Sequence, residues 1–242
     1  MHDRSRRKYL PPMILRIGTS GYSYKEWKGT FYPEDLKPAD MLSYYGERLG
    51  TVEINNTFYH MPTKKLLQGW ASQVPAAFRF VLKVSQKVTH YKRLKDVEEE
   101  VAYLRETIPV LGEKLGALLV QIPPNLKRDD ERLSVFLDLM SGVRMALEVR
   151  NDSWLVPEVL ALLEKRGVAL VTSETDEDPE PRLERTASWG YLRLRKMAYD
   201  ERELALWSKK IAAQAWAEAF VFFKHEQIGP GLAQKLTEVA AK

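Results

Sequence analysis

The segment Met145 to Trp154 reads M-A-L-E-V-R-N-D-S-W, an apolar run that ends in an acid, a base and a polar turn. Side chains alternate across a strand, so Glu148 and Arg150 share one face while Leu147 and Val149 share the other. A buried charge needs a partner or a chemical task. The segment therefore predicts a strand with a functional site at its end.

A second segment is also an apolar strand with polar residues on one face, and similar short strands recur along the chain. Thr51 to Tyr59 reads T-V-E-I-N-N-T-F-Y, in which Glu53 and Asn55 share a face. Other short apolar runs alternate with stretches of helical period, which is typical of parallel βα units. The predicted strands are Ile14–Thr19, Thr51–Asn55, Phe78–Val84, Ala117–Ile122, Met145–Val149, Ala169–Thr172, Gly190–Leu194 and Ala219–Phe223.

Eight strands in 242 residues favour a TIM-type (β/α)8 barrel, an α/β single domain, over an open doubly wound sheet. Helical stripes follow most of the strands, including Pro38 to Leu49 and a helix that Asp96 is predicted to cap. Between strands six and seven, the segment Glu174 to Ser188 contains two prolines and no helical stripe. That helix is therefore predicted to be reduced or missing.

Charge and composition limit the classes of function. The net charge of +4 permits a polyanionic partner without requiring one. Residues 1–12 are predicted to be a basic flexible arm, and residues 13–242 the barrel domain. The chain has no cysteine, which excludes disulfides, thiolate zinc sites and cysteine nucleophiles. No apolar stretch approaches the roughly 18 residues that span a bilayer, and no hydrophobic signal core follows the basic cluster, so we expect no membrane association and a cytoplasmic location.

In such barrels the active site lies at the C-terminal ends of the strands. Glu148 or Glu53 is predicted to act as a general acid or base. Lys83 leaves the apolar segment F-R-F-V-L-K-V and is predicted to be a base or an anion clamp. Each residue also has a structural interpretation, in which Glu148 forms a satisfied ion pair with Arg150 and Lys83 pairs with an acid.

Further polar and aromatic side chains are predicted to contact the substrate. Aromatic residues in loops either stack on a sugar or base or pack the loops themselves. The predicted substrate-binding residues are Arg150, Asn55, Gln121, Tyr22, Trp27, His90, Trp154, Arg195 and Lys224.

No cofactor and no metal are predicted. The four histidines lack a metal-ligand spacing, although Glu53, Glu148, His90 and His225 could be assembled across strand ends. The Gly18 to Gly21 turn lacks the lysine of a P-loop. A glycosidase pair is not favoured, because Glu53 and Glu148 lie on strands two and five, which contribute to different layers.

Five motifs, in their order and spacing, resemble those of one known family. They are G-T-S-G-Y-S-Y-K-E-W-K-G-T-F-Y-P (Gly18 to Pro33), E-I-N-N-T-F-Y-H-M-P (Glu53 to Pro62), K-V-S-Q-K-V-T-H (Lys83 to His90), Q-I-P-P (Gln121 to Pro124) and A-L-E-V-R-N-D-S-W (Ala146 to Trp154). From Leu15 onward the chain resembles the YecE-like family, domain of unknown function 72. The resemblance implies a TIM-type barrel and no established reaction.

The last third departs from the pattern of that family. Where relatives usually carry an acid, a histidine-glycine pair and asparagines, this chain has Thr172-Ser173, Arg195-Lys196 and Lys224-His225. At the C-terminal ends of the later strands, which form the second half of the barrel mouth, this chain is therefore more cationic than its relatives. This difference indicates either that it binds a variant of the family's ligand or that it has lost activity.

The first functional hypothesis is a metal-independent enzyme acting on a small polar anion, phosphate- or carboxylate-bearing and sugar- or nucleotide-derived. General acid/base chemistry of the hydrolase, lyase or isomerase type fits its residues. The alternatives are a nucleic-acid or nucleotide-binding protein without catalysis, and a partner-binding scaffold with a vestigial site. The sequence predicts no oligomeric state.

Overall fold

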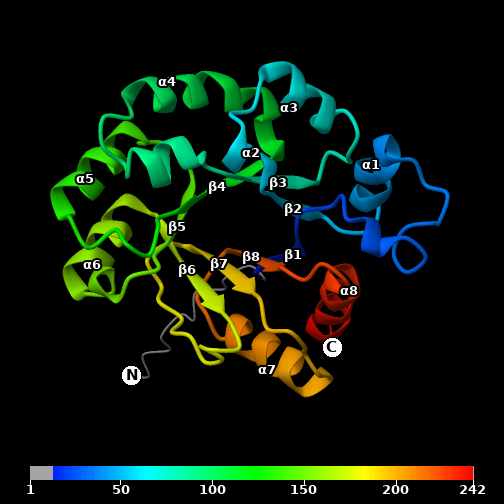
Figure 1. Cartoon of the computed structure of the whole chain (residues 1–242). Helices are drawn as coiled ribbons and strands as arrows, with labels where there is room; N and C mark the ends of the chain where they lie inside the picture. The colour runs from blue at the N-terminus through cyan, green and yellow to red at the C-terminus, as the bar shows by residue number, and fades with distance from the viewer. Residues whose placement is uncertain (1–12, 242) are drawn as a thin grey trace, which may run out of the picture.

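The computed structural model describes residues 13–241, in which eight parallel strands close into a barrel (Figure 1). Each strand pairs with the next in chain order, and β8 pairs with β1 to close the ring. The strands are β1 (Ile14–Ser20), β2 (Thr51–Ile54), β3 (Arg79–Lys83), β4 (Leu115–Gln121), β5 (Met145–Glu148), β6 (Ala169–Glu174), β7 (Trp189–Leu194) and β8 (Glu218–Phe223). The predicted TIM-type barrel is confirmed, with all eight strands near their predicted positions.

The helices lie outside the ring of strands (Figure 1). They are α1 (Met41–Gly46), α2 (Asn56–Tyr59), α3 (Lys64–Ala71), α4 (Glu98–Thr107), α5 (Asp130–Leu139), α6 (Pro157–Arg166), α7 (Glu201–Ala212) and α8 (Gly229–Ala240). Short 3₁₀ turns occupy Lys25–Trp27, Pro38–Asp40, Ile108–Lys114 and Asp152–Trp154, and Lys87–Tyr91 forms a π-helical turn. Local sequence sets several ends: Asp200 and Glu203 form a capping box at the start of α7, and Gly167, with φ at 65°, ends α6.

Two predicted helix boundaries are wrong. Pro38 to Leu49 is not one helix, because a 3₁₀ turn precedes α1 and α1 ends at Gly46. Asp96 does not cap α4. Its backbone is left-handed, with φ at 51°, whereas an N-cap residue needs an extended backbone, and Val97 occupies the position before the helix.

The segment between β6 and β7 contains no helix within the described chain, as its prolines predict. β6 extends to Glu174, two residues beyond its predicted end. The strand therefore does end in an acid, although the sequence interpretation placed Thr172-Ser173 there. The Glu174 carboxylate accepts a hydrogen bond of 2.5 Å from the Tyr199 hydroxyl.

The apolar core has two parts. One packs the outer faces of the strands against the helices. The other fills the barrel, with Phe220 and Phe222 stacked at 6.2 Å, and consists of Val81, Ala117, Leu119, Ala146, Ala169, Val171, Trp189, Tyr191, Phe220 and Phe222. This inner cluster forms an apolar floor, and polar side chains lie beyond it at the C-terminal ends of the strands.

The predicted basic arm, residues 1–12, lies outside the described residues. Of the helices between residues 13 and 241, none combines the length and hydropathy needed to cross a membrane.

Candidate functional site

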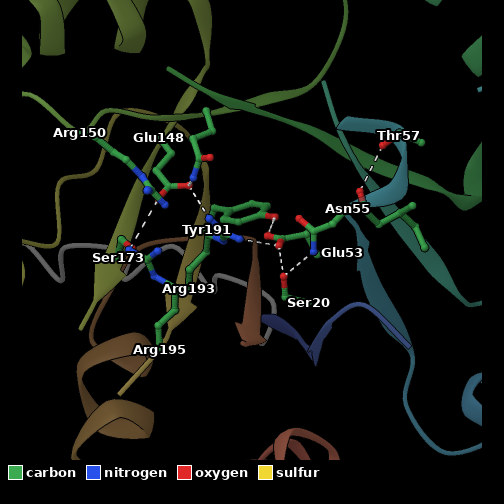
Figure 2. A network of polar contacts seen from close by, with 12 residues as sticks. Ser20, Glu53, Asn55, Thr57, Glu148, Arg150, Ser173, Tyr191, Arg193 and Arg195 are labelled. Atoms are coloured by element: carbon green, nitrogen blue, oxygen red, sulfur yellow. Dashed lines mark hydrogen bonds and ion pairs between the residues drawn. The ribbon is translucent and has the colours of Figure 1, made fainter. Parts of the chain in front are cut away.

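A single buried arginine joins the two predicted catalytic acids (Figure 2). Nη2 of Arg193 lies 2.9 Å from Oε1 of Glu53, and Nη1 lies 2.6 Å from Oε2 of Glu148. All three side chains are at most 2% exposed. Each buried charge is thereby paired, as its removal from water requires.

Alternation along β7 aims Arg193 inward. Leu192 and Leu194 belong to the outer core, while Tyr191 belongs to the inner cluster and Arg193 shares its face. Burial alone would lower the pKa of the Arg193 guanidinium, but Glu148 and Glu53 outweigh burial and raise it. The arginine is therefore a permanent cation.

Glu53 is fully buried, and protein donors reach both of its oxygens. Besides Arg193, the Ser20 hydroxyl donates to Oε1, and the Tyr191 hydroxyl donates to Oε2 at 2.6 Å. Nδ2 of Asn55 donates to the Ser20 oxygen at 2.8 Å, so Asn55 reaches Glu53 only through Ser20. These donors fix the carboxylate within the layer above the floor (Figure 2).

A second group of hydrogen-bond donors surrounds the Glu148 carboxylate. Gln121 donates to Oε2 at 2.7 Å, while Nε and Nη2 of Arg150 each lie 3.3 Å from Oε1. Arg195 approaches the same Oε1 to 3.8 Å and donates to the Ser173 hydroxyl at 2.6 Å. Burial by itself would raise the pKa of the Glu148 carboxyl, but the three arginines and Gln121 lower it to about 2. Glu148 is therefore ionised at neutral pH.

Lys83, at the end of β3, has an unusual environment for a lysine. Its Nζ lies 3.9 Å from the centre of the Phe58 ring. Among residues 13–241, no carboxylate oxygen lies within 4.0 Å of it, so the structural alternative of pairing with an acid is not realised. Burial and the nearby Arg193 lower the pKa of Lys83 to about 8.

His90 and Lys224 complete the mouth. His90 lies on the π-helical turn after β3; burial and the charges of Lys83 and Arg150 lower the pKa of its imidazole. Lys224 follows β8, and burial with the charges of Arg193 and Arg195 lowers the pKa of its ammonium group. Both residues are thus electrostatic neighbours of the polar layer.

Three predicted aromatic residues lie away from this layer. Trp27 is 0% and Trp154 is 1% exposed, and the Trp154 indole donates to the Leu126 carbonyl at 2.8 Å. Tyr22 is half-buried, with its ring 6.4 Å from that of Tyr45. The two tryptophans therefore pack the loops, the structural alternative for loop aromatics, and their burial leaves no ring face for a ligand.

Sequence reasoning identified both acids but did not predict that Arg193 joins them. It expected Glu53 and Glu148 in different layers and so not as a direct pair, and the structure links the two carboxylates through one guanidinium. The missed signal is the alternation in Y-L-R-L-R, which places Tyr191, Arg193 and Arg195 on one face of β7.

The histidines and acids do not assemble as metal ligands. Within the described part of the chain, no three His, Cys, Asp or Glu side chains are grouped so as to hold a metal ion. The set of Glu53, Glu148, His90 and His225 considered from the sequence is therefore not brought together.

Comparisons by sequence find relatives of this chain. A family model described as "Protein of unknown function DUF72" matches residues 16–242. The curated "UPF0759 protein YecE" of Escherichia coli (strain K12), like that of strain O157:H7, is 27% identical over 143 residues, 58% of this chain and 50% of that protein. The chain thus spans about half the length of the curated relatives it matches.

Solved structures show the same architecture. A DUF72 family protein from Thermotoga maritima MSB8 is 25% identical, with a TM-score of 0.79 over 95% of this chain and 100% of that one. One from Enterococcus faecalis V583 is 22% identical, with a TM-score of 0.77 over 95% and 98% of the two chains, and shows likeness of fold.

Proposed function

The chain belongs to the DUF72 family, whose description names no reaction, and we propose from its own side chains that the barrel mouth binds a small anionic substrate and transfers protons on it. The observation that carries this proposal is an excess of positive charge at the C-terminal ends of the strands. No metal takes part in the proposed chemistry.

The charge excess follows from the contacts of the two carboxylates. Glu53 and Glu148 are both bound to Arg193. Around this triad stand further cations: Lys83, Arg150, Arg195 and Lys224. Arg150 and Arg195 share one oxygen of Glu148, and Nε of Arg195 has no hydrogen-bond partner among the described residues. These groups keep donors available for an anion.

The lowered pKa values of three cations at the site indicate that an added negative charge would be stabilised there. Burial is the largest cause of the lowered pKa values of Lys83, Lys224 and Arg195, and in each case a neighbouring arginine lowers the pKa further. A bound phosphate or carboxylate would offset this repulsion. Arg150 and Arg195 provide the planar donor groups that such anions prefer.

Space for the rest of a ligand lies next to Arg150. A cavity of about 440 Å³ opens between β6 and the segment that replaces the missing helix, within the range of small-molecule sites. Its lining contains Arg150 and Ser173, together with the carboxylates Asp178 and Glu180. Carboxylates accept hydrogen bonds from hydroxyl groups, which favours a hydroxylated anion such as a sugar phosphate or sugar acid.

We assign proton transfer to Lys83 rather than to the acids. A group with a pKa of about 8 can both take up and release a proton near neutral pH. Glu148, with a pKa of about 2, instead serves as a fixed anion that orients Arg150, Arg193 and Arg195. Glu53 holds the other end of Arg193.

The proposal is tested by titrating the purified protein with phosphate, sugar phosphates and sugar acids in a calorimeter. We expect saturable binding, and Arg195→Gln should weaken it by about 1.5–3 kcal/mol, roughly 10- to 150-fold in Kd, because a charge-assisted hydrogen bond is lost. Arg128→Gln is the matched control, since Arg128 pairs with Asp130 and Glu158 on the surface.

Two results would contradict the proposal. One is the absence of saturable binding to any of these anions, and the other is an equal loss of affinity in both variants. Binding only to nucleic acid, with an affinity that falls steeply with salt, would favour the alternative of a nucleic-acid-binding protein.

A further inference from the structure

Lys83 and His90 pack on the same aromatic ring. Nζ of Lys83 lies 3.9 Å from the centre of the Phe58 ring, on its face, and the imidazole of His90 meets that ring at 86° with 5.0 Å between centroids. Phe58 belongs to α2, Lys83 ends β3, and His90 lies on the π-helical turn that follows. Three successive segments thus place an amine and an imidazole against one ring, and the charge of Lys83 acts on the imidazole.

The surroundings of Lys83 favour its neutral form. The charged groups that face it are Arg193, Glu53, Glu148, Arg150 and His90. Burial, with Arg193 next in size, outweighs the two acids and lowers the pKa of Lys83 to about 8. About half of the amine is therefore neutral at pH 8, against well under 1% for an ordinary lysine of pKa about 10.4. A neutral, desolvated amine next to other cations is an activated nucleophile.

The imidazole is suited to move protons beside this amine. Nδ1 of His90 lies 2.8 Å from the Thr89 hydroxyl, which fixes the ring. Burial, Lys83 and Arg150 lower the pKa of His90, so the imidazole is mainly neutral at pH 7 and can accept a proton. Arg150 is an electrostatic neighbour of both groups, which places an anion-binding guanidinium beside them.

We propose that Lys83 forms a Schiff base with the carbonyl carbon of a small anionic aldehyde or ketone, whose anionic group is held by Arg150 and Arg195 while His90 transfers the protons. This inference rests on the proposed anion-binding function and narrows its substrate class to carbonyl compounds that carry a carboxylate or a phosphate. Lys83, whose amine exchanges protons near neutral pH, is then also the nucleophile, and His90 is its partner in proton transfer.

The chemistry needs no redox partner. The lone pair of the neutral Nζ attacks the carbonyl carbon, the C–N bond forms, and the electron pair of the C=O bond moves to oxygen. His90 removes a proton from nitrogen and protonates the oxygen, which gives a carbinolamine. His90 takes up the proton that the ammonium form of Lys83 released before the attack and delivers it to the hydroxyl group, so that water leaves and the C=N bond forms. Overall, one ammonium group and one carbonyl group give one protonated imine and one water.

Reductive trapping tests the inference. The wild-type protein is incubated at pH 8 with sodium cyanoborohydride and either pyruvate, which carries a carboxylate, or dihydroxyacetone phosphate. An imine is reduced to a stable secondary amine, so the protein gains the mass of the probe acid minus one oxygen atom, and peptide mapping locates the adduct. We expect labelling of Lys83 at least about tenfold above any other lysine, because of its larger neutral fraction. The more effective probe identifies the anionic group.

Variants separate this inference from the proposed function. Lys83→Met should abolish the adduct, whereas Lys64→Met, which removes an exposed lysine paired with Glu106, should keep it. Labelling spread evenly over the lysines of the wild type, in a protein that binds phosphate through Arg195, would overturn the Schiff base and leave anion binding intact. Absence of phosphate binding in the wild type would overturn both. Mapping of the wild type decides the question even where a variant fails to fold.

Discussion

Removing the central arginine by Arg193→Met should destabilise the barrel strongly, because Glu53 and Glu148 would remain buried without their shared cation. The lowering of the Glu148 pKa from 4.5 to about 2 corresponds to about 3 kcal/mol of net favourable interaction for its ionised form. Breaking a buried ion pair from one side costs about 3–5 kcal/mol in other proteins. For a chain of this size, such a loss lowers Tm by roughly 10 °C.

Urea unfolding at several pH values would measure this loss. In the wild type the Glu148 pKa is lowered, so its stabilising contribution is complete above the unfolded-state pKa of 4.5 and disappears as the pH falls towards about 2. In the variant, burial without Arg193 raises the pKa of the Glu148 carboxyl. Acidification from pH 7 to 5 then protonates it in the folded state, and the difference between the two proteins should narrow.

Arg195→Met is the matched control for this experiment, because Arg195 lies 3.8 Å from Glu148 and has one hydrogen bond, to Ser173. We expect it to lose about 1 kcal/mol. Adding Glu53→Gln and Glu148→Gln to Arg193→Met should restore part of the stability. Equal losses in the two arginine variants, or a loss in Arg193→Met that does not change with pH, would refute the assignment of Arg193 as the ionic centre.

Three further substitutions test the packing by urea unfolding. Gly18→Ala should destabilise by about 1–3 kcal/mol or more, because its Cβ would lie 2.0 Å from the Thr51 carbonyl oxygen; an unchanged stability would show that β1 and β2 can separate. Gly231→Ala, in α8 with open space around the added Cβ, should instead stabilise by up to about 1 kcal/mol, and a destabilisation would contradict its helical environment. Tyr191→Phe should cost about 1–3 kcal/mol, since Glu53 loses a donor at 2.6 Å; an unchanged stability would mean that water replaces the hydroxyl.

The fold could be predicted from local sequence because every strand is a short apolar run. Proline content also predicted the missing helix between β6 and β7. Helix ends were harder, as the Asp96 error illustrates. Arg93, Leu94 and Asp96 all have positive φ, and Leu94 is only 2% exposed. The burial of Leu94 stabilises the turn from Arg93 to Asp96 in this backbone conformation. Local capping preferences cannot predict a conformation that depends on such long-range packing.

The candidate site could be predicted only in part. Glu53, Glu148 and Arg150 stand at strand ends in the sequence. In the structure Arg150 contacts Glu148, and Arg193 links Glu148 to Glu53. The interaction between Arg193 and Glu53 spans 140 residues and depends on the reach of one side chain across the barrel. The role of the loop aromatics was also ambiguous, because a tryptophan such as Trp27 or Trp154 can either stack on a ligand or pack in the core. Lys83 was singled out, but its position over Phe58 was not foreseeable.

The pairing of β1 with β8 also determines when this protein can finish folding. Ile14 to Thr19 align with Glu218 to Phe223, so strands from opposite ends of the chain form one seam. At a synthesis rate of about 5–20 residues per second, the first strand waits roughly 10–40 s for its last partner to emerge from the ribosome. Until then β1 has an unpaired edge, which can pair with another chain. Newly made copies are thus prone to aggregation until the barrel closes, and slowing translation between β1 and β8 would lengthen that interval.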